Sequence, residues 1–131
     1  MMPSLAPSAP GLVVGLPFPP SVNRIWRKGR TPAGKHITYI DKKYKAWRNE
    51  ADAMLMGKMP KQRVAGPFVA FITLDVRRRR KGADADNRIK VTLDYLQRID
   101  LIDNDSLAET VSVTWGNAPS GCAVLIVPVP A

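Results

Sequence analysis

The sequence has 131 residues, of which 45% are hydrophobic, so the chain is long enough for one packed core and too apolar to be intrinsically disordered. No apolar run approaches the ~20 residues that cross a bilayer, and the single Cys122 and single His36 exclude an intramolecular disulfide and a Cys- or His-rich zinc site. Lys and Arg number 20 against 11 Asp and Glu, and the resulting net charge of +9 favours nucleic acid or an anionic membrane as the partner.

The first half of the chain predicts one strand and one helix, joined by a basic loop. Residues 1–10 lack the basic start and apolar centre of a secretory signal, and we expect a flexible N-terminal extension of a cytoplasmic protein. Residues 11–16 are typical of a short strand, which the prolines that follow bring to an end. Residues 21–38 combine cations with two glycines and predict an exposed loop, with His36 in it.

Apolar residues at helical spacing predict a first helix over residues 41–55. Its core face is expected to contain Tyr44, Trp47, Ala51, Met54 and Leu55. Residues 68–76 follow the two-residue period of a strand, with Phe68, Ala70, Ile72, Leu74 and Val76 on one face.

The second half predicts a helix and two more strands. Residues 86–97 form the helix, with Asp86 as its N-cap and a buried stripe of Ile89, Thr92, Leu93 and Leu96. A hairpin is expected between residues 109–115 and residues 122–127, across a turn at 117–121. Cys122, in its second strand, is expected to be buried and inert. The order β-α-β-α-β-β predicts a single α+β domain, a mixed and mostly antiparallel sheet with two helices packed on it.

Two aspartates follow the predicted strand 68–76. Asp84 and Asp86 are two residues apart, so in an extended chain their side chains point to one side, on the order of 7 Å apart at Cα. Carboxylates this close repel each other unless a cation lies between them, and oxygen ligands suit Mg²⁺ or Mn²⁺. The structural alternative is that Asp86 caps the helix and Asp84 pairs with a neighbouring arginine.

Lys90 lies one helical turn beyond Asp86 and can share its face. If it faces a metal-bound phosphate, it would stabilise the extra negative charge of the transition state. The alternative is an ordinary helix ion pair with Asp86 or Asp94. An acid from the loop after the helix can return to the metal, but spacing alone does not choose among Asp100, Asp103 and Asp105.

The cations are concentrated in two segments. The run from Arg77 to Lys81 cannot be buried without partners, and the acids beside it favour phosphate binding over a merely solvated loop. Trp26 either stacks on an exposed base or anchors its own loop. The candidate DNA-binding residues are Arg24, Arg27, Lys28, Arg30, Arg77, Arg78, Arg79, Arg80 and Lys81.

Several of these segments, in this order, resemble the RusA family of Holliday-junction resolvases, small endonucleases encoded by bacteria and phages. They are Pro19-Pro20-Ser21-Val22-Asn23-Arg24, Arg78-Arg79-Arg80, Asp84-Ala85-Asp86-Asn87-Arg88-Ile89-Lys90, Asp94-Tyr95-Leu96 and Leu101-Ile102-Asp103-Asn104-Asp105-Ser106. The likeness extends from about Leu16 to Trp115. Asn104 departs from the acid common in the family, and Leu107 from its frequent glutamine.

The resemblance implies a homodimer that binds four-way DNA junctions and hydrolyses symmetric strands in recombination and repair, with Mg²⁺ or Mn²⁺, without a small-molecule cofactor and without a membrane. By position it implies that Asp84, Asp86 and Asp105 are metal-binding catalytic aspartates and that Lys90 is the catalytic lysine. Two rival functions remain: a nuclease for other branched or flapped DNA, and a non-catalytic nucleic-acid-binding module. The second explains the acids less well, because carboxylates near phosphate weaken a pure binder.

Overall fold

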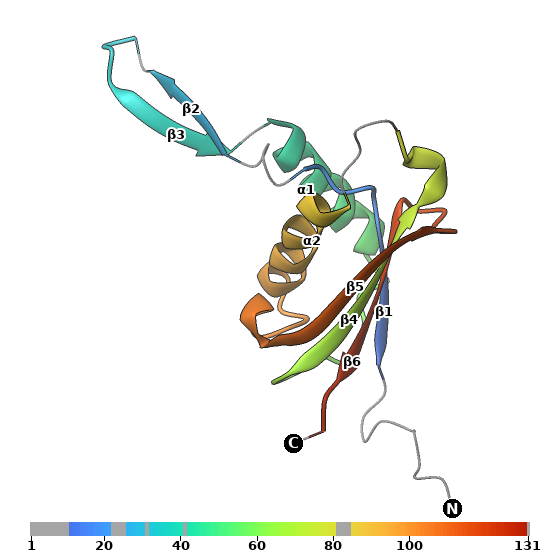
Figure 1. Cartoon of the computed structure of the whole chain (residues 1–131). Coiled ribbons are helices and arrows are strands. Elements are labelled where there is room, and N and C mark those ends of the chain that lie inside the picture. The colour runs from blue at the N-terminus through green and yellow to red at the C-terminus, as the bar shows by residue number, and fades with distance from the viewer. Residues whose placement is uncertain (1–10, 22–25, 31, 41, 81–84, 131) are drawn as a thin grey trace, which may run out of the picture.

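The computed structural model describes residues 11–21, 26–30, 32–40, 42–80 and 85–130, and it describes only the backbone of 26–30 and 36–40. A four-stranded sheet carries two helices on one of its faces, and a separate two-stranded hairpin projects from the same end as the start of the first helix (Figure 1). The elements are β1 (Leu12–Leu16), β2 (Trp26–Arg30), β3 (His36–Ile40), α1 (Lys42–Leu55), β4 (Phe68–Asp75), α2 (Asp86–Arg98), β5 (Ala108–Gly116) and β6 (Cys122–Pro128).

The core lies between the sheet and the helices, as the two apolar periodicities predict. Alternate residues of β1, β4 and β6 are buried, and Tyr44, Trp47, Ala51 and Leu55 of α1 pack against them. Helix α2 buries Val91, Thr92, Leu93, Tyr95 and Leu96. Cys122 is fully buried, as predicted, and burial raises the pKa of its thiol to about 12. Val76 departs from its predicted face: the strand ends at Asp75, and Val76 begins an exposed 3₁₀ turn.

The predicted hairpin between the last two strands is wrong. The strand order is β1-β6-β4-β5, so β4 lies between β5 and β6. Strand β5 runs parallel to β4, after the crossover through α2, and β6 is antiparallel to both β4 and β1. The β4–α2–β5 crossover packs α2 on the sheet and returns the chain parallel to β4. Strand β6 then pairs with the other edge of β4, between β4 and β1. The residues of the predicted turn instead cross the end of β4, where the Asp75 N–H donates to the Gly121 carbonyl.

The predicted basic loop at 21–38 is also wrong in part, because β2 and β3 form an antiparallel hairpin there, with His36 paired opposite Arg30 (Figure 1). Residues 36–40 are rich in β-forming side chains, and Gly34 adopts a positive φ of 83° in the turn. The exposed turn and the strands together present the basic segment away from the sheet.

The α+β class, the mixed and mostly antiparallel sheet and the two helices in the order β-α-β-α-β-β are confirmed, with the β2–β3 hairpin added between the first strand and the first helix. Among the described residues, no helix has the length and apolar character to span a membrane.

Candidate active site

Helix α2 carries three of the polar side chains singled out in the sequence. Asp86 is its first residue and is exposed, and Lys90 and Asp94 follow at intervals of four. The prediction that Asp86 is the N-cap is wrong: Ala85 occupies that position with helical dihedral angles, and no side chain caps the helix there. The Asp86 carboxylate is therefore in the first turn, where the helix dipole favours a negative charge.

The Lys90 ammonium lies between two carboxylates. Its Nζ donates to the Asp94 side chain at 3.0 Å and to the Asp105 side chain. These hydrogen bonds, that to Asp105 first, raise the pKa of Lys90 above its ordinary value. Lys90 in turn lowers the pKa of Asp105, whereas burial is the main cause that raises the pKa of Asp94. At neutral pH Asp105 is consequently ionised and Lys90 is charged.

The loop that carries Asp105 is fixed by two short-range hydrogen bonds. The Asn104 side chain accepts from the Ser106 N–H at 2.9 Å and begins the 3₁₀ turn Asp105–Leu107. The Gln97 side chain accepts from the backbone N–H of Asp105 at 3.0 Å. Lys90 and Gln97 lie on one helix face, two turns apart. Helix α2 therefore contacts Asp105 twice: Lys90 contacts the Asp105 side chain, and Gln97 contacts the Asp105 backbone.

The other two loop acids contact a different residue. Arg63 donates to the Asp100 side chain at 3.0 Å and also to that of Asp103. The second oxygen of Asp103 accepts from the Gly66 N–H at 3.0 Å, and this backbone hydrogen bond is the main cause that lowers the pKa of Asp103. These two acids therefore connect the loop to residues 63–66, whereas Asp105 faces Lys90.

The arginine run is divided in its contacts. Arg77 pairs with Asp75, whose carboxylate is buried and whose pKa is lowered chiefly by the Arg77 hydrogen bond. The Arg79 guanidinium lies 5.5 Å from the centre of the Trp115 ring, and Arg78 and Arg80 are exposed. Asp75 was not singled out from the sequence, because it continues a strand pattern that otherwise contains apolar residues and threonine.

Several predicted site residues fall outside the described residues: Asp84, Lys81 and Arg24. The side chains of Arg27, Lys28 and Arg30, and that of Trp26, are also outside the description, although their backbone forms β2. Within the described part of the chain, no three His, Cys, Asp or Glu side chains form a group that could bind a metal ion.

The donors that the structure does describe suit a hard divalent ion. Asp86 is exposed at a helix start and Asp105 is ionised, so both offer carboxylate oxygens, the ligand type that Mg²⁺ and Mn²⁺ prefer. The Asp94 carboxylate contacts both Lys90 and Asp105. By the type of donor atom, Asp86 and Asp105 fit Mg²⁺.

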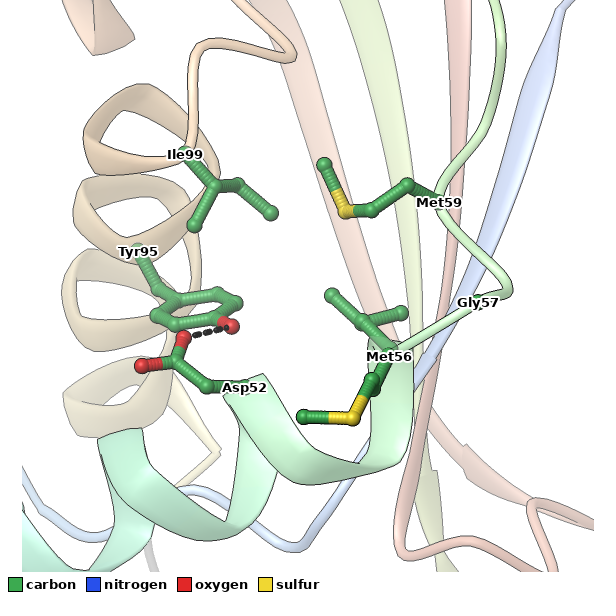
Figure 2. A pocket seen from close by; sticks show the side chains of 7 residues that line it. Asp52, Met56, Gly57, Met59, Tyr95 and Ile99 are labelled. Atoms are coloured by element: carbon green, nitrogen blue, oxygen red, sulfur yellow. Dashed lines mark hydrogen bonds between the residues drawn. The ribbon is translucent and has the colours of Figure 1, made fainter.

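A cavity of about 190 Å³ lies on another side of α2, between this helix and the end of α1 (Figure 2). Met56, Met59 and Ile99 line much of it, and the Tyr95 hydroxyl donates to Asp52 at 2.7 Å at its edge. Burial is the main cause that raises the pKa of Tyr95. The Tyr95–Asp52 contact joins the two helices and takes no part in the Lys90 group.

One more contact that the sequence did not predict joins α2 to the proline-rich segment 17–20. The Arg88 guanidinium lies 4.6 Å from the centre of the Phe18 ring and donates to the Pro19 carbonyl. The segment that leads toward the basic hairpin is thereby attached beside the first turn of α2. The adjacent prolines were a signal for a fixed chain path, but nothing in the local pattern identified Arg88 as their partner.

The described site thus combines acids and a lysine on helix α2 of a basic α+β domain. The family model of the RusA endodeoxyribonuclease matches residues 17–126, which is most of the chain and includes all of the described site. The chain therefore belongs to the RusA family of endodeoxyribonucleases. Comparison with curated proteins found no match.

Proposed function

We propose that this protein is a metal-dependent endodeoxyribonuclease that resolves four-way DNA junctions by phosphodiester hydrolysis during recombination and repair. Membership of the RusA family supports the class of reaction. The observation that carries the proposed site is the contact between Lys90 and Asp105, because it joins two residues that the resemblance identifies as catalytic and that lie 15 positions apart.

Asp84, Asp86 and Asp105 would bind Mg²⁺, with Mn²⁺ as a substitute. The ion would supply a lowered pKa for the attacking water and neutralisation of the scissile phosphate. Lys90 is charged at neutral pH and half exposed, so its ammonium is available to a phosphate oxygen that gains negative charge. The exposed Arg78, Arg79 and Arg80 would hold the DNA backbone.

The defining experiment incubates the protein with a synthetic four-way junction, a flapped duplex and a plain duplex, each with and without Mg²⁺. We expect paired incisions in the junction only when Mg²⁺ is present. Preferred cleavage of the flap would identify a different branched-DNA nuclease, and binding without any cleavage would identify a non-catalytic module.

Removing two exposed cations should weaken DNA binding without changing the chemical step. Arg78→Ala combined with Arg79→Ala removes guanidinium groups that are available to phosphates, unlike Arg77, which pairs with the buried Asp75. Binding titrations over a range of salt concentrations should show weaker affinity for every DNA form. The negative slope of log K against log salt should become shallower by about 0.9 for each phosphate contact that is lost. A double variant that binds normally but cleaves slowly at saturating protein would contradict this assignment.

We propose further that two copies of the chain associate through the open face of the sheet. Phe71, Leu125 and Val13 are exposed there and lie in one row across three adjacent strands, since Leu125 pairs with each of the other two. Eleven outward positions of the four strands carry no charge: Val13, Gly15, Val69, Phe71, Thr73, Thr110, Ser112, Thr114, Ala123, Leu125 and Val127. The charged residues of these strands lie at their ends, where Asp75 pairs with Arg77 and Glu109 lies at the register shift of β5.

A second copy is the occupant that this face favours. The middle of this face offers DNA phosphates no cation, and two copies of a chain with net charge +9 repel each other least where neither presents charge. A two-fold pairing of the same surface is self-complementary, and two sheets can stack about 10 Å apart. The helices and the candidate site would remain outside the contact.

Light scattering coupled to gel filtration tests the association. The wild-type protein should be a dimer, and Phe71→Lys combined with Leu125→Lys should be a folded monomer, because lysines would place charge within the contact. Met56→Lys is the matched control, since Met56 is 79% exposed on the other side of the molecule's core, at the end of α1. A monomeric wild type, or a double variant that stays dimeric, would contradict the proposed contact.

A further inference from the structure

Asp94 differs from the other acids near Lys90 in how it is attached to the molecule. It lies one turn after Lys90 on the same helix, and its carboxylate is 3.0 Å from the Lys90 Nζ. Asp105, the other partner of Lys90, belongs to a loop. The i, i+4 spacing of one helix therefore sets the Lys90–Asp94 pair, although the Asp94 carboxylate also contacts that of Asp105.

The two acids also differ in the work available to them. Under the proposed function Asp105 binds the metal, and a carboxylate bound to a divalent cation attracts an ammonium less strongly. Lys90 has a long, flexible side chain that would then lose one of its two anchors. Asp94 is the described partner of Lys90 that is not itself a proposed metal ligand, so it would keep its contact with the ammonium.

We propose that Asp94 is a positioning residue that anchors the Lys90 ammonium on α2 while Asp105 serves the metal. This inference rests on the proposed catalytic role of Lys90. Asp94 itself contacts neither substrate nor the reacting atoms in this role, and it acts by fixing the direction from which the ammonium approaches the phosphate. Misplacing a catalytic group by about 1 Å can cost roughly 10²-fold in rate.

The test compares Asp94→Asn, Asp94→Glu and Asp52→Asn. Asp52→Asn is the matched control: it makes the same change in net charge, on α1, where the side chain accepts from the Tyr95 hydroxyl (Figure 2). For each variant the single-turnover rate is measured on a four-way junction at saturating protein and Mg²⁺. Junction affinity is measured without Mg²⁺, and thermal melting confirms that each variant is folded.

We expect Asp94→Asn to lower the saturated rate by roughly 10- to 100-fold with junction affinity unchanged or slightly higher. Asp94→Glu should recover most of the rate because it restores a charged acceptor, and Asp52→Asn should cleave like the wild type. A wild-type rate in Asp94→Asn, or an equal loss in Asp52→Asn, would overturn the inference.

A second measurement does not depend on cleavage. The reaction of the Lys90 amine with an amine-selective reagent, followed by peptide mass spectrometry in metal-free protein, should become several-fold faster in Asp94→Asn and stay unchanged in Asp52→Asn. Unchanged Lys90 reactivity in Asp94→Asn would overturn the anchoring role. If the wild type fails to cut any junction, the proposed function fails, and the Lys90 reactivity still decides whether Asp94 anchors the ammonium.

Discussion

Asp105→Asn is expected to lower the Mg²⁺-dependent cleavage rate by at least roughly 10³-fold while junction binding stays intact or becomes tighter. The substitution removes a proposed metal ligand, which supplies several kcal/mol of charge stabilisation in the transition state, and it also removes a negative charge near the DNA phosphates. The loop itself should remain in place, because Gln97 accepts from the backbone N–H of residue 105 and Asn104 still begins the 3₁₀ turn. Single-turnover cleavage and a binding titration in parallel measure the two effects.

Asp103→Asn is the control for this prediction, since it removes an acid two residues away in the same loop. Asp103 contacts Arg63 and the Gly66 N–H, so its loss should lower the melting temperature slightly and leave most of the cleavage rate. An essential Asp103 together with a dispensable Asp105 would show that the loop has been assigned to the wrong acid.

Gly121→Ala is expected to produce the largest loss of stability. Gly121 has a φ of 121°, and a Cβ built there would lie 2.3 Å from the Phe18 nitrogen and 2.9 Å from the Pro17 carbonyl carbon. Both contacts are to backbone, so no side-chain rotation relieves them. The strained φ and the forced displacement should together lower the free energy of unfolding by about 3–5 kcal/mol. Thermal unfolding should then show a decrease of roughly 10 °C or more.

Gly57→Ala separates the two contributions to that loss. Gly57 also has a positive φ, of 74°, but no atom outside its chain neighbours lies within 4 Å of the position of its Cβ. Its substitution should cost only about 1–2 kcal/mol, the strain of a left-handed backbone. Equal losses in both variants would show that the contact with residues 17 and 18 carries no cost.

The sequence predicted the positions of the helices and strands better than it predicted which strands lie next to each other. Apolar periodicity located α1, β4 and α2 closely, because burial of one face imposes the period on the side chains. The order of the strands is decided by contacts between distant residues, and both edges of β4 are compatible with the same alternation. The β2–β3 hairpin was missed because its cations suggested a solvated loop, although Ile37 and Tyr39 favour a strand.

The candidate site was predicted in part from local spacing and in part from resemblance. Helical spacing identified Lys90 and Asp94 as a possible pair, and the structure contains that ion pair. Local spacing left Asp100, Asp103 and Asp105 equivalent, because what distinguishes them is the contact each makes across the fold. Arg63 lies 40 positions before Asp103 and Lys90 lies 15 before Asp105, and no short-range pattern reports either separation.

The place of β6 in the sheet constrains how the protein can be made. This strand comprises residues 122–128, yet it lies between β1 and β4, so β1 has no partner in the sheet until that last segment has been synthesised. Contacts between residues this far apart in sequence form slowly, because a long loop must close first. During translation β1 and the β6-facing edge of β4 would therefore lack their partner strand, a period when aggregation competes with folding. Truncations that remove β6 should yield insoluble protein, even though they leave every proposed catalytic residue in the chain.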